Sequence, residues 1–344
     1  MKIGLITYHH SNNYGAVLQS YATYKALRLL GHEVEFINIR QTEKRKLRHI
    51  AFLLKYLQFK KFMHKFYPKE TPYIDNIQAL QKIKINYDCL MVGSDQVWNP
   101  NISKDKCLAY FLDFGPESIK RISYASSFGI NIWPSSKNYL LPNITKALQR
   151  FNYISVRENT GKELLLNKFN LEAKVVVDPT MLHNEYSEIT GNIKENQDII
   201  CYLLNRTKEQ FKISQYISKQ LHAPLKLISN IYPIKGFKYV YPPSIKGWIQ
   251  YIGGAKFVIT DSFHGAVFSL LYQRNFIVVA VENGRNSRLT DLLKTFGLEN
   301  RYITNINEAQ NIIPTLKDID YTQITPILNS KRKESWDFLK NSLS

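Results

Sequence analysis

The first forty residues combine apolar segments with a helical repeat and predict a strand–helix–strand unit. Residues 2–8 are typical of a buried strand, and apolar side chains then recur at helical spacing over about 16–30. Gly31 is placed to end this helix, and residues 34–39 have the pattern of a second strand. A βαβ unit of this kind opens a parallel, doubly wound sheet.

Short apolar segments further along have the length of buried strands, and each leads into a polar loop. They cover residues 89–92, 122–125, 154–156 and 175–177. Ser, Asp, Arg or Glu follows each of them within two residues. Because ligands of open α/β sheets bind outside the carboxyl ends of the strands, we expect a binding site at that edge.

A second series of strands and helices starts after Pro179. Strands are predicted at 199–204, 225–228, 257–260 and 276–281, with helical segments between them. The polar stretch 181–196 lacks periodic apolar residues, and we place a domain boundary there. The predicted fold class is α/β, with two Rossmann-like domains facing a cleft. The expected parts are an N-terminal domain over 1–182 with a basic helical insertion at about 41–70, a C-terminal domain over 183–322, and a last helix over 323–344.

Composition excludes several classes of protein. Hydrophobic residues make up 44% and charged residues 22% of the 344 residues, which does not fit a fibre, a coiled coil or a disordered chain. No apolar run is long enough to span a bilayer, and the first residues are too short and too β-like for a secretory signal. The three widely spaced cysteines predict core positions and no disulfide framework. The expected location is the cytoplasm.

Neither a metal nor an organic cofactor is predicted. The eight histidines form no His-Glu-x-x-His motif and no cluster with Asp at ligand spacing. The loop at 12–15 lacks the three-glycine spacing of dinucleotide-binding loops, so NAD is not expected.

The charge of the chain is less ordinary than its composition. The net charge is +18, and residues 40–70 hold ten Lys or Arg against two Glu. As a helix, this stretch has two apolar faces. One face carries Leu47, Ile50, Leu54 and Leu57, and the other carries Phe52, Tyr56, Phe59, Met63 and Phe66. Either one face packs on the body while the other rests on an anionic lipid surface, or both are buried between the domain and a partner subunit.

The segment from Phe257 to Phe268 carries the most informative chemistry. A short apolar strand leads into Asp261, Ser262, His264 and Gly265, where a helix begins. The start of a helix presents unpaired N–H groups to an anion, and a histidine there is placed for proton transfer. The alternative is structural, with Asp261 or Ser262 capping the helix and His264 packed beneath it.

Two other predicted strand ends carry charged residues. Arg157 suits bidentate binding of a carboxylate or phosphate, and the alternative is an ion pair with Glu158 or another nearby acid. Ser94 and Asp95 are candidates for a hydroxyl-binding group and a carboxylate base, and the alternative is an Asp that caps a turn. Together these residues suggest a small anionic substrate.

The order of the motifs in this chain resembles that of the polysaccharide pyruvyl transferases. The motifs are Asn13-Tyr14-Gly15-Ala16-Val17-Leu18-Gln19, Leu30-Gly31-His32-Glu33-Val34, Val92-Gly93-Ser94-Asp95-Gln96-Val97-Trp98-Asn99, Ser155-Val156-Arg157-Glu158, Val177-Asp178-Pro179-Thr180 and Thr260-Asp261-Ser262-Phe263-His264-Gly265. With their flanking elements they span about residues 2–301. They are specific to the family and not to one substrate.

The resemblance implies a fold similar to the GT-B glycosyltransferases, with the helix over 323–344 packing back toward the N-terminal domain. It implies transfer of the enolpyruvyl unit of phosphoenolpyruvate onto two hydroxyls of one sugar, which forms a pyruvate ketal and releases phosphate. His264 is then expected to protonate the enol carbon and Arg157 to bind the donor, and Asp95 is our candidate base. Further substrate contacts are expected from Asn13, Tyr14, Gly15, Ser94, Gln96, Glu158, Asp261, Ser262 and Gly265.

Ser262 departs from the pattern of the family, in which some members have an arginine two residues before the motif histidine. Lys256, Arg285 or Arg288, or the N–H groups around His264, are expected to bind phosphate instead.

The acceptor implied by the resemblance is a saccharide of a surface polysaccharide, built on a polyprenyl diphosphate at the inner leaflet. Peripheral contact with the inner face of the membrane is consistent with that acceptor. The alternative function is a GT-B-type glycosyltransferase that uses a sugar nucleotide. A third hypothesis, a nucleic-acid or membrane-binding protein without catalysis, rests on net charge alone. The chain lacks RNA-binding and helix-turn-helix motifs, so no nucleic-acid partner is expected.

Overall fold

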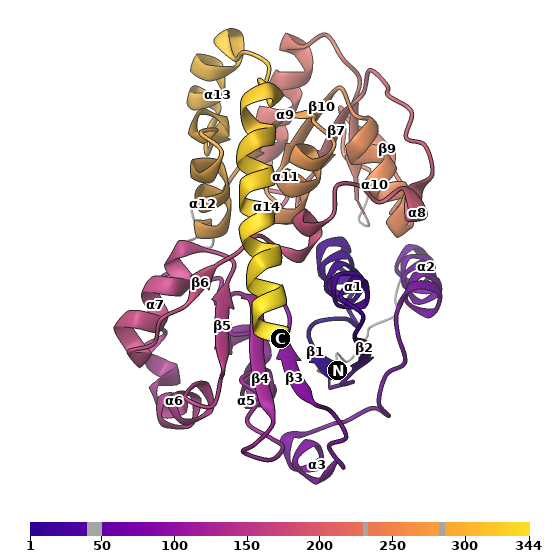
Figure 1. Ribbon diagram of the computed structural model, residues 1–344. Coiled ribbons are helices and arrows are strands. Elements are labelled where there is room, and N and C mark those ends of the chain that lie inside the picture. The colour runs from indigo at the N-terminus through magenta and orange to yellow at the C-terminus, as the bar shows by residue number, and fades with distance from the viewer. Residues whose placement is uncertain (40–49, 230–232, 282–285) are drawn as a thin grey trace. The chain divides into compact units, whose positions relative to one another are not determined.

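The computed structural model describes residues 1–39, 50–229, 233–281 and 286–344, with only the backbone of 50–52. These residues form two compact units. The first contains residues 1–39, Met63–Leu182 and Asn329–Ser344, and the second contains residues 50–62 and His183–Leu328. Each unit is built on one six-stranded sheet (Figure 1).

The sheet of the first unit is parallel throughout, with the order β2-β1-β3-β4-β5-β6. Its strands are β1 (Lys2–Ile6), β2 (Glu33–Phe36), β3 (Cys89–Val92), β4 (Lys120–Ser126), β5 (Tyr153–Val156) and β6 (Lys174–Val175). Its helices are α1 (Tyr14–Leu29), α3 (Ile77–Lys82), α4 (Pro100–Ser103), α5 (Cys107–Tyr110), α6 (Leu141–Leu148) and α7 (Asn159–Phe169).

Helices cover both faces of this sheet. On one face, α5, α6 and α7 pack in a core that includes Leu90 and Val92. On the other face, α1 and the end of α14 (Tyr321–Leu343) pack in a core that includes Leu5 and Met91. Because both faces are covered, all four residues of β3 are buried, as is typical of a parallel sheet.

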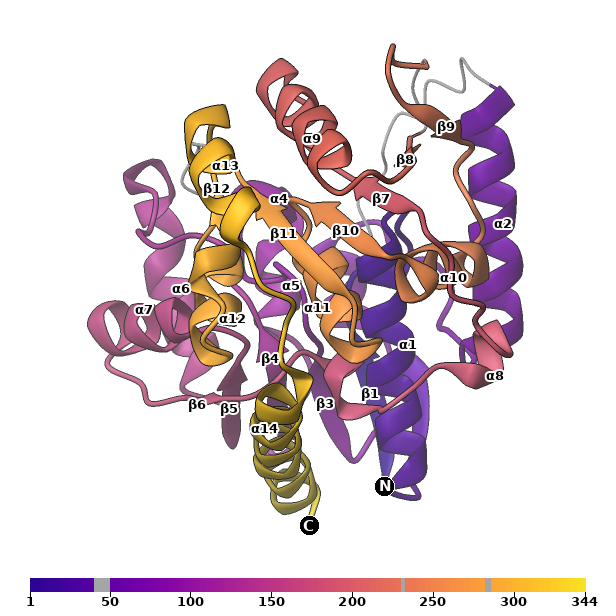
Figure 2. The same cartoon turned by 90° about the horizontal axis from the view of Figure 1, so that it is seen from above.

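The sheet of the second unit is also parallel, with the order β12-β11-β10-β7-β8-β9. Its strands are β7 (Ile199–Tyr202), β8 (Leu225–Ile228), β9 (Lys238–Val240), β10 (Phe257–Thr260), β11 (Asn275–Val279) and β12 (Tyr302–Ile303). Its helices are α8 (Ser187–Thr190), α9 (Lys208–Gln220), α10 (Ile245–Gly254), α11 (Phe263–Leu271), α12 (Ser287–Thr295) and α13 (Ile306–Ile312). Figure 2 shows α9 and α13 on one side of β7 and β10, and α10 and α11 on the other.

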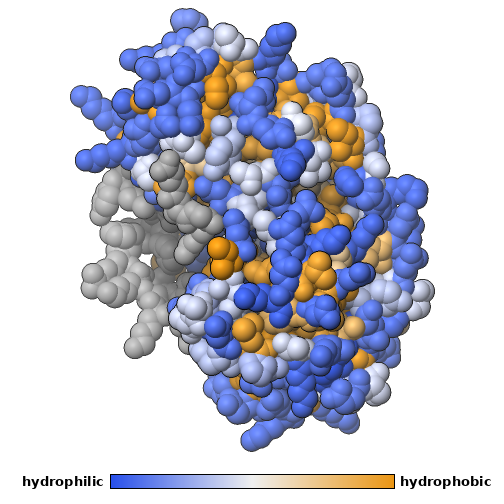
Figure 3. Space-filling model, turned by 90° about the vertical axis from the view of Figure 1, so that its left-hand side faces the viewer, coloured by the Kyte–Doolittle hydropathy of each residue, from blue (hydrophilic) through white to orange (hydrophobic). Residues whose placement is uncertain are grey.

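The predicted fold class is confirmed in both units, because each is an α/β structure with one parallel sheet. That the two domains face a cleft stays a prediction. None of the described helices is long and apolar enough to cross a membrane. Figure 3 shows one face of the molecule, on which hydrophilic residues predominate.

Within the predicted basic insertion, residues 50–66 form helix α2 (Ile50–Phe66), and residues 41–49 lie outside the described part of the chain. Phe59 and Phe62 are buried, whereas Leu53, Leu54 and Leu57 are 43–49% exposed. The exposed leucines continue along the helix into exposed basic residues, which are Lys60, Lys61, His64 and Lys65. Leu53, Leu54 and Leu57 therefore form an exposed apolar patch on α2 that is bordered by positive charge.

Candidate functional site

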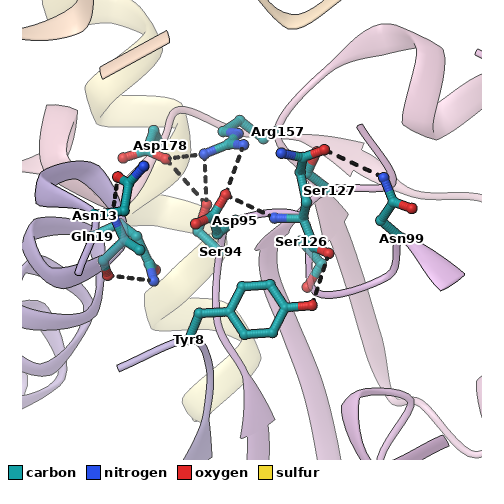
Figure 4. Close-up of polar contacts among 12 residues, drawn as sticks. Tyr8, Asn13, Gln19, Ser94, Asp95, Asn99, Ser126, Ser127, Arg157 and Asp178 are labelled. Carbon is teal, nitrogen blue, oxygen red and sulfur yellow. Dashed lines mark hydrogen bonds and ion pairs between the residues drawn. The ribbon is translucent and has the colours of Figure 1, made fainter. Parts of the chain in front are cut away.

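Polar residues of the first unit gather at the carboxyl ends of β3, β5 and β6. Ser94 and Asp95 follow β3, Arg157 follows β5, and Asp178 comes soon after β6. Because these parallel strands end at one edge of the sheet, their following residues meet there. Figure 4 shows the polar contacts that link them.

Arg157 is buried among three carboxylates. Its Nη1 donates to Asp178 Oδ2 at 2.7 Å. Its Nη2 lies 3.7 Å from Asp95 Oδ1, and its Nε lies 3.8 Å from Glu158 Oε2. Burial alone lowers the pKa of Arg157, but attraction to Asp178, Asp95 and Glu158 raises it above its ordinary value. The ion pairs of the structural alternative are therefore present. Contact between Arg157 and a donor stays a prediction.

Asp95 differs from the other two acids because it reaches solvent. Its side chain is 15% exposed, against 0% for Asp178 and 2% for Glu158. Its φ of 75° is a left-handed conformation that is unusual outside glycine. The N–H groups of Ser127 and Gln96 hold the residue by donating to its carbonyl oxygen at 3.0 Å and its Oδ1 at 2.9 Å. Asp95 is thus a fixed, accessible carboxylate that can accept a proton.

The predicted binding residues Asn13, Tyr14 and Gly15 form the start of α1. Asn13 caps the helix, because its side-chain oxygen accepts the N–H of Ala16 at 3.2 Å. Tyr14 and Gly15 lie in the first turn, where both are buried. Asn13 is the exposed member of the three and the one that a ligand can reach.

Ser94, Gln96 and Glu158 are tied into the same edge. Ser94 Oγ donates to Asp178 Oδ2 at 3.1 Å, and Glu158 Oε1 accepts the Ser127 hydroxyl at 2.6 Å. Gln96 is partly exposed, whereas Ser94 and Glu158 are buried. The structure therefore brings these three residues together with Asp95 and Arg157.

In the second unit, Asp261 ties the loop after β10 to the loop after β7. Its carboxylate accepts the N–H groups of Leu204 and Asn205 at 2.6 Å and 3.0 Å, and the side-chain amide of Gln210 at 3.1 Å. Asp261 is 8% exposed. It therefore positions the β7 loop, whereas Ser262 is the residue that caps α11.

His264 lies in the first turn of α11 at the carboxyl end of β10, with 6% of its surface exposed. Its ring meets that of Phe263 edge-on, with the centroids 5.3 Å apart. Gly265 permits the close approach of helix and strand, because a Cβ there would lie 2.4 Å from Thr260 Oγ1. His264 thus lies in the first turn of a helix at the carboxyl end of a strand, as predicted from the sequence.

The predicted phosphate-binding cations lie in different places. Lys256 precedes β10, at the opposite end of the strand from His264, and its Nζ is 3.4 Å from the carbonyl oxygen of Leu221. A strand rises about 3.3 Å per residue, so the whole of β10 separates Lys256 from His264. The prediction that Lys256 binds phosphate beside His264 is therefore wrong. Arg288 is partly buried in the first turn of α12, after β11. Arg285 lies outside the described residues.

Two charged residues of these edges were not among the predicted site residues. Asp178 pairs with Arg157. Arg206 follows β7 with a φ of 55°, and its Nε donates to Leu203 O at 3.1 Å. Both come just after strands that the sequence predicts, so the carboxyl-edge rule could have found them.

The fold is similar to solved structures that cover nearly the whole chain. One is UDP-GlcNAc 2-epimerase from Neisseria meningitidis bound to UDP-GlcNAc, with a TM-score of 0.60, 10% identity, and coverage of 100% of this chain and 99% of that one. Another is Arabidopsis thaliana UGT89C1 complexed with UDP-L-rhamnose, with a TM-score of 0.56, 8% identity, and coverage of 99% and 98%. At such low identity these similarities show the fold, which is of the GT-B type.

None of the curated proteins is similar enough in sequence to match the chain. The family model for polysaccharide pyruvyl transferases matches residues 13–283, a range that includes Asp95, Arg157 and His264. This range is most of the chain, and the chain belongs to the polysaccharide pyruvyl transferase family.

Proposed function

We propose that this protein transfers the enolpyruvyl unit of phosphoenolpyruvate onto two hydroxyls of one sugar in a surface-polysaccharide intermediate, releasing phosphate. Family membership supports the class of reaction. The observation that carries the proposal is the position of His264, which begins a helix at the carboxyl end of β10. The two strands that flank β10 are each followed by an arginine, Arg206 after β7 and Arg288 after β11.

In this proposal His264 is the general acid. It protonates the methylene carbon of phosphoenolpyruvate, which becomes a methyl group and leaves an oxocarbenium-like carbon beside it. The first sugar hydroxyl adds to that carbon and loses its proton to a base. The second hydroxyl then displaces phosphate from the same carbon, and its proton balances the charge of the leaving phosphate. The products are one ketal and one phosphate.

Asp95 is the base we propose for the first hydroxyl, because it is the most exposed of the three acids around Arg157. Arg157 positions it, since the guanidinium lies 3.7 Å from Asp95 Oδ1. The arginine is also the residue that the resemblance assigns to the donor. Either role requires the planar guanidinium, which a lysine cannot reproduce.

Phosphate binding is assigned in this proposal to Arg206 and Arg288, in place of the arginine that some family members have where this chain has Ser262. Asp261 supports this assignment because it fixes residues 204 and 205, directly before Arg206, to the loop that leads into His264. Two guanidinium groups suit a phosphate monoester.

The test is phosphate release from phosphoenolpyruvate with saccharide acceptors. His264→Ala should lower turnover by at least about 100-fold, the contribution of a general acid. Arg206→Gln should mainly raise KM for phosphoenolpyruvate. His222→Asn is the matched control, because this exposed histidine of the same unit has a φ of 46° that asparagine tolerates. Retention of more than about a tenth of the activity by His264→Ala would exclude the general-acid role.

The alternative is a glycosyltransferase that uses a sugar nucleotide. It is favoured by the ligands bound in the two solved structures, UDP-GlcNAc and UDP-L-rhamnose. Those proteins are 10% or less identical in sequence to this chain. Thermal unfolding with each ligand separates the two functions. Protection by phosphoenolpyruvate supports the pyruvyl transferase, and protection by a nucleoside diphosphate sugar supports the alternative.

We also propose that α2 contacts an anionic membrane surface, where a lipid-linked acceptor would lie. Its exposed leucines and the basic residues beside them have the pattern of an interfacial helix. Replacing Lys60, Lys61 and Lys65 with Gln should weaken binding to anionic vesicles about a hundredfold, since each basic residue contributes about 1 kcal/mol. The matched control replaces three exposed lysines of α9, which are Lys208, Lys212 and Lys219. Absence of vesicle binding by the wild type at low salt would refute the proposal.

A further inference from the structure

Two histidines that follow β1 lie against a glutamate far away in the sequence. His9 Nε2 is 3.4 Å and His10 Nε2 is 2.6 Å from Glu70 Oε2. The three atoms lie within 4.8 Å of one another, and among the described residues this is the one group of His, Cys, Asp and Glu with the spacing of metal ligands. We call His9, His10 and Glu70 the His–His–Glu cluster.

His9 is held in the orientation of a metal ligand. Its Nδ1 lies 3.0 Å from the carbonyl oxygen of Thr7, which can only accept a hydrogen bond, so Nδ1 carries the proton. In the neutral ring the lone pair is then on Nε2, which faces Glu70. The ring stacks on Phe36 with the centroids 4.6 Å apart, and its side chain is 1% exposed. A hydrogen bond from the other ring nitrogen to a carbonyl is the usual support of a metal-binding histidine.

A cation between His9 and Glu70 resolves an electrostatic conflict. A buried nitrogen lone pair and a carboxylate oxygen repel each other, and among the described residues no hydrogen-bond donor reaches Nε2 of His9. Their separation of 3.4 Å matches the ligand-to-ligand distance of about 3.4 Å in a tetrahedral site with bonds of about 2.1 Å. His10 and Glu70 must move apart by about 1 Å to complete such a site. Both can do so, because their side chains are 16% and 39% exposed.

The backbone already holds the three ligands in place. The segment that carries Glu70 runs beside β2, because Phe36 N–H donates to Lys69 O at 3.0 Å and Thr71 N–H donates to Phe36 O at 2.9 Å. Tyr67 Oη donates to His9 O at 3.3 Å, which fixes the loop after β1. The cluster therefore requires side-chain adjustment alone, and the chain need not rearrange.

We propose that the His–His–Glu cluster binds one divalent transition-metal cation of the zinc type, with water as the remaining ligand. Two imidazoles and one carboxylate are a common ligand set for such ions. The bound ion would link the loop after β1 to the segment after α2. This inference is independent of the reaction proposed above.

The experiment titrates tag-free protein, freed of metal by a chelator, with Zn²⁺ in a calorimeter and with Co²⁺ by visible absorption. We expect one equivalent of either ion and a Co²⁺ spectrum of mixed nitrogen and oxygen ligation. Removing a residue that only supports a metal ligand weakens binding by about 10–100-fold. Glu70→Gln and His10→Ala change ligands themselves, so each should weaken binding by more than that. His9 is left unchanged because its ring is part of the core. His64→Ala, at an exposed position of α2 outside the cluster, is the matched control.

Binding that is lost in Glu70→Gln and His10→Ala and kept in His64→Ala supports the site. The proposal is overturned if the wild type binds neither ion, which would leave a charged hydrogen bond between His10 and Glu70. It is also overturned if the two cluster variants bind as tightly as the wild type. Circular dichroism of each variant checks that the fold is intact, and no outcome depends on phosphate release.

Discussion

Removing the guanidinium of Arg157 should destabilise the first unit by an amount that follows from its burial. Arg157→Ala leaves the carboxylates of Asp178 and Glu158, with side chains 0% and 2% exposed, without their cation. Breaking a buried ion pair from one side costs about 3–5 kcal/mol. Arg157→Lys keeps the charge but loses the fork that contacts both Asp178 and Asp95. We expect it to cost about 1.5–3 kcal/mol, the value of one charged hydrogen bond.

Tryptophan fluorescence can follow the first unit alone. The chain has four tryptophans, of which Trp98, Trp133 and Trp336 belong to the first unit and Trp248 belongs to the second. In a Trp248→Phe background, urea unfolding followed by fluorescence therefore reports on the first unit. Because every protein compared carries this substitution, its own cost cancels.

The control is Lys333→Gln, which removes an ion pair with Asp337 on α14. The side chains of Lys333 and Asp337 are 79% and 48% exposed. Its unfolding midpoint should equal that of the background, because exposed pairs contribute little. An unchanged midpoint in Arg157→Ala would refute the reasoning from burial. The kinetics of Arg157→Lys add a second readout. A raised KM for phosphoenolpyruvate with little loss of stability would indicate donor binding rather than support of the acids.

Two further predictions concern close packing and the thiols. Gly265→Ala should lower the free energy of unfolding by about 1–3 kcal/mol and reduce phosphate release, because the new Cβ would lie 2.4 Å from Thr260 Oγ1 and push α11 away from β10. Thermal unfolding measures the first effect and the phosphate assay the second. Wild-type values in both would contradict the packing. Burial raises the pKa of Cys89 and Cys201 to about 12, so at pH 8 a thiol reagent should label these two residues only after urea unfolds the protein. Rapid labelling of the native protein, read by mass spectrometry, would contradict their burial.

The central strands of both sheets could be predicted because strands buried on both faces are short and mostly apolar. β3 and β10 are examples, with all four residues buried in each. The edge strands β9 and β12 were not predicted. They contain three and two residues, too few for a periodic pattern, and β9 begins with an exposed lysine.

Much of the candidate site could also be predicted, because residues that follow parallel strands share one edge. Asp95, Arg157 and His264 were found in this way. The ion pair between Arg157 and Glu158 could be predicted as well. The pairing of Arg157 with Asp178 and of Asp261 with the loop after β7 could not, because each joins residues that follow different strands. The prediction of no metal site considered motifs close in sequence, whereas His10 and Glu70 are 60 residues apart and meet only in the folded sheet.

The first unit is built from segments that lie far apart in the sequence, and this affects how it folds during synthesis. Asn329–Ser344 belongs to this unit, and Leu339 and Leu343 are part of the core that contains Ile3 and Leu5. Domains usually fold in the order in which the ribosome releases them. Here His183–Leu328 is released before the last helix of the first unit is made. We therefore expect the N-terminal sheet to wait with part of one hydrophobic face uncovered until Asn329–Ser344 is released, and to need chaperones most during that interval.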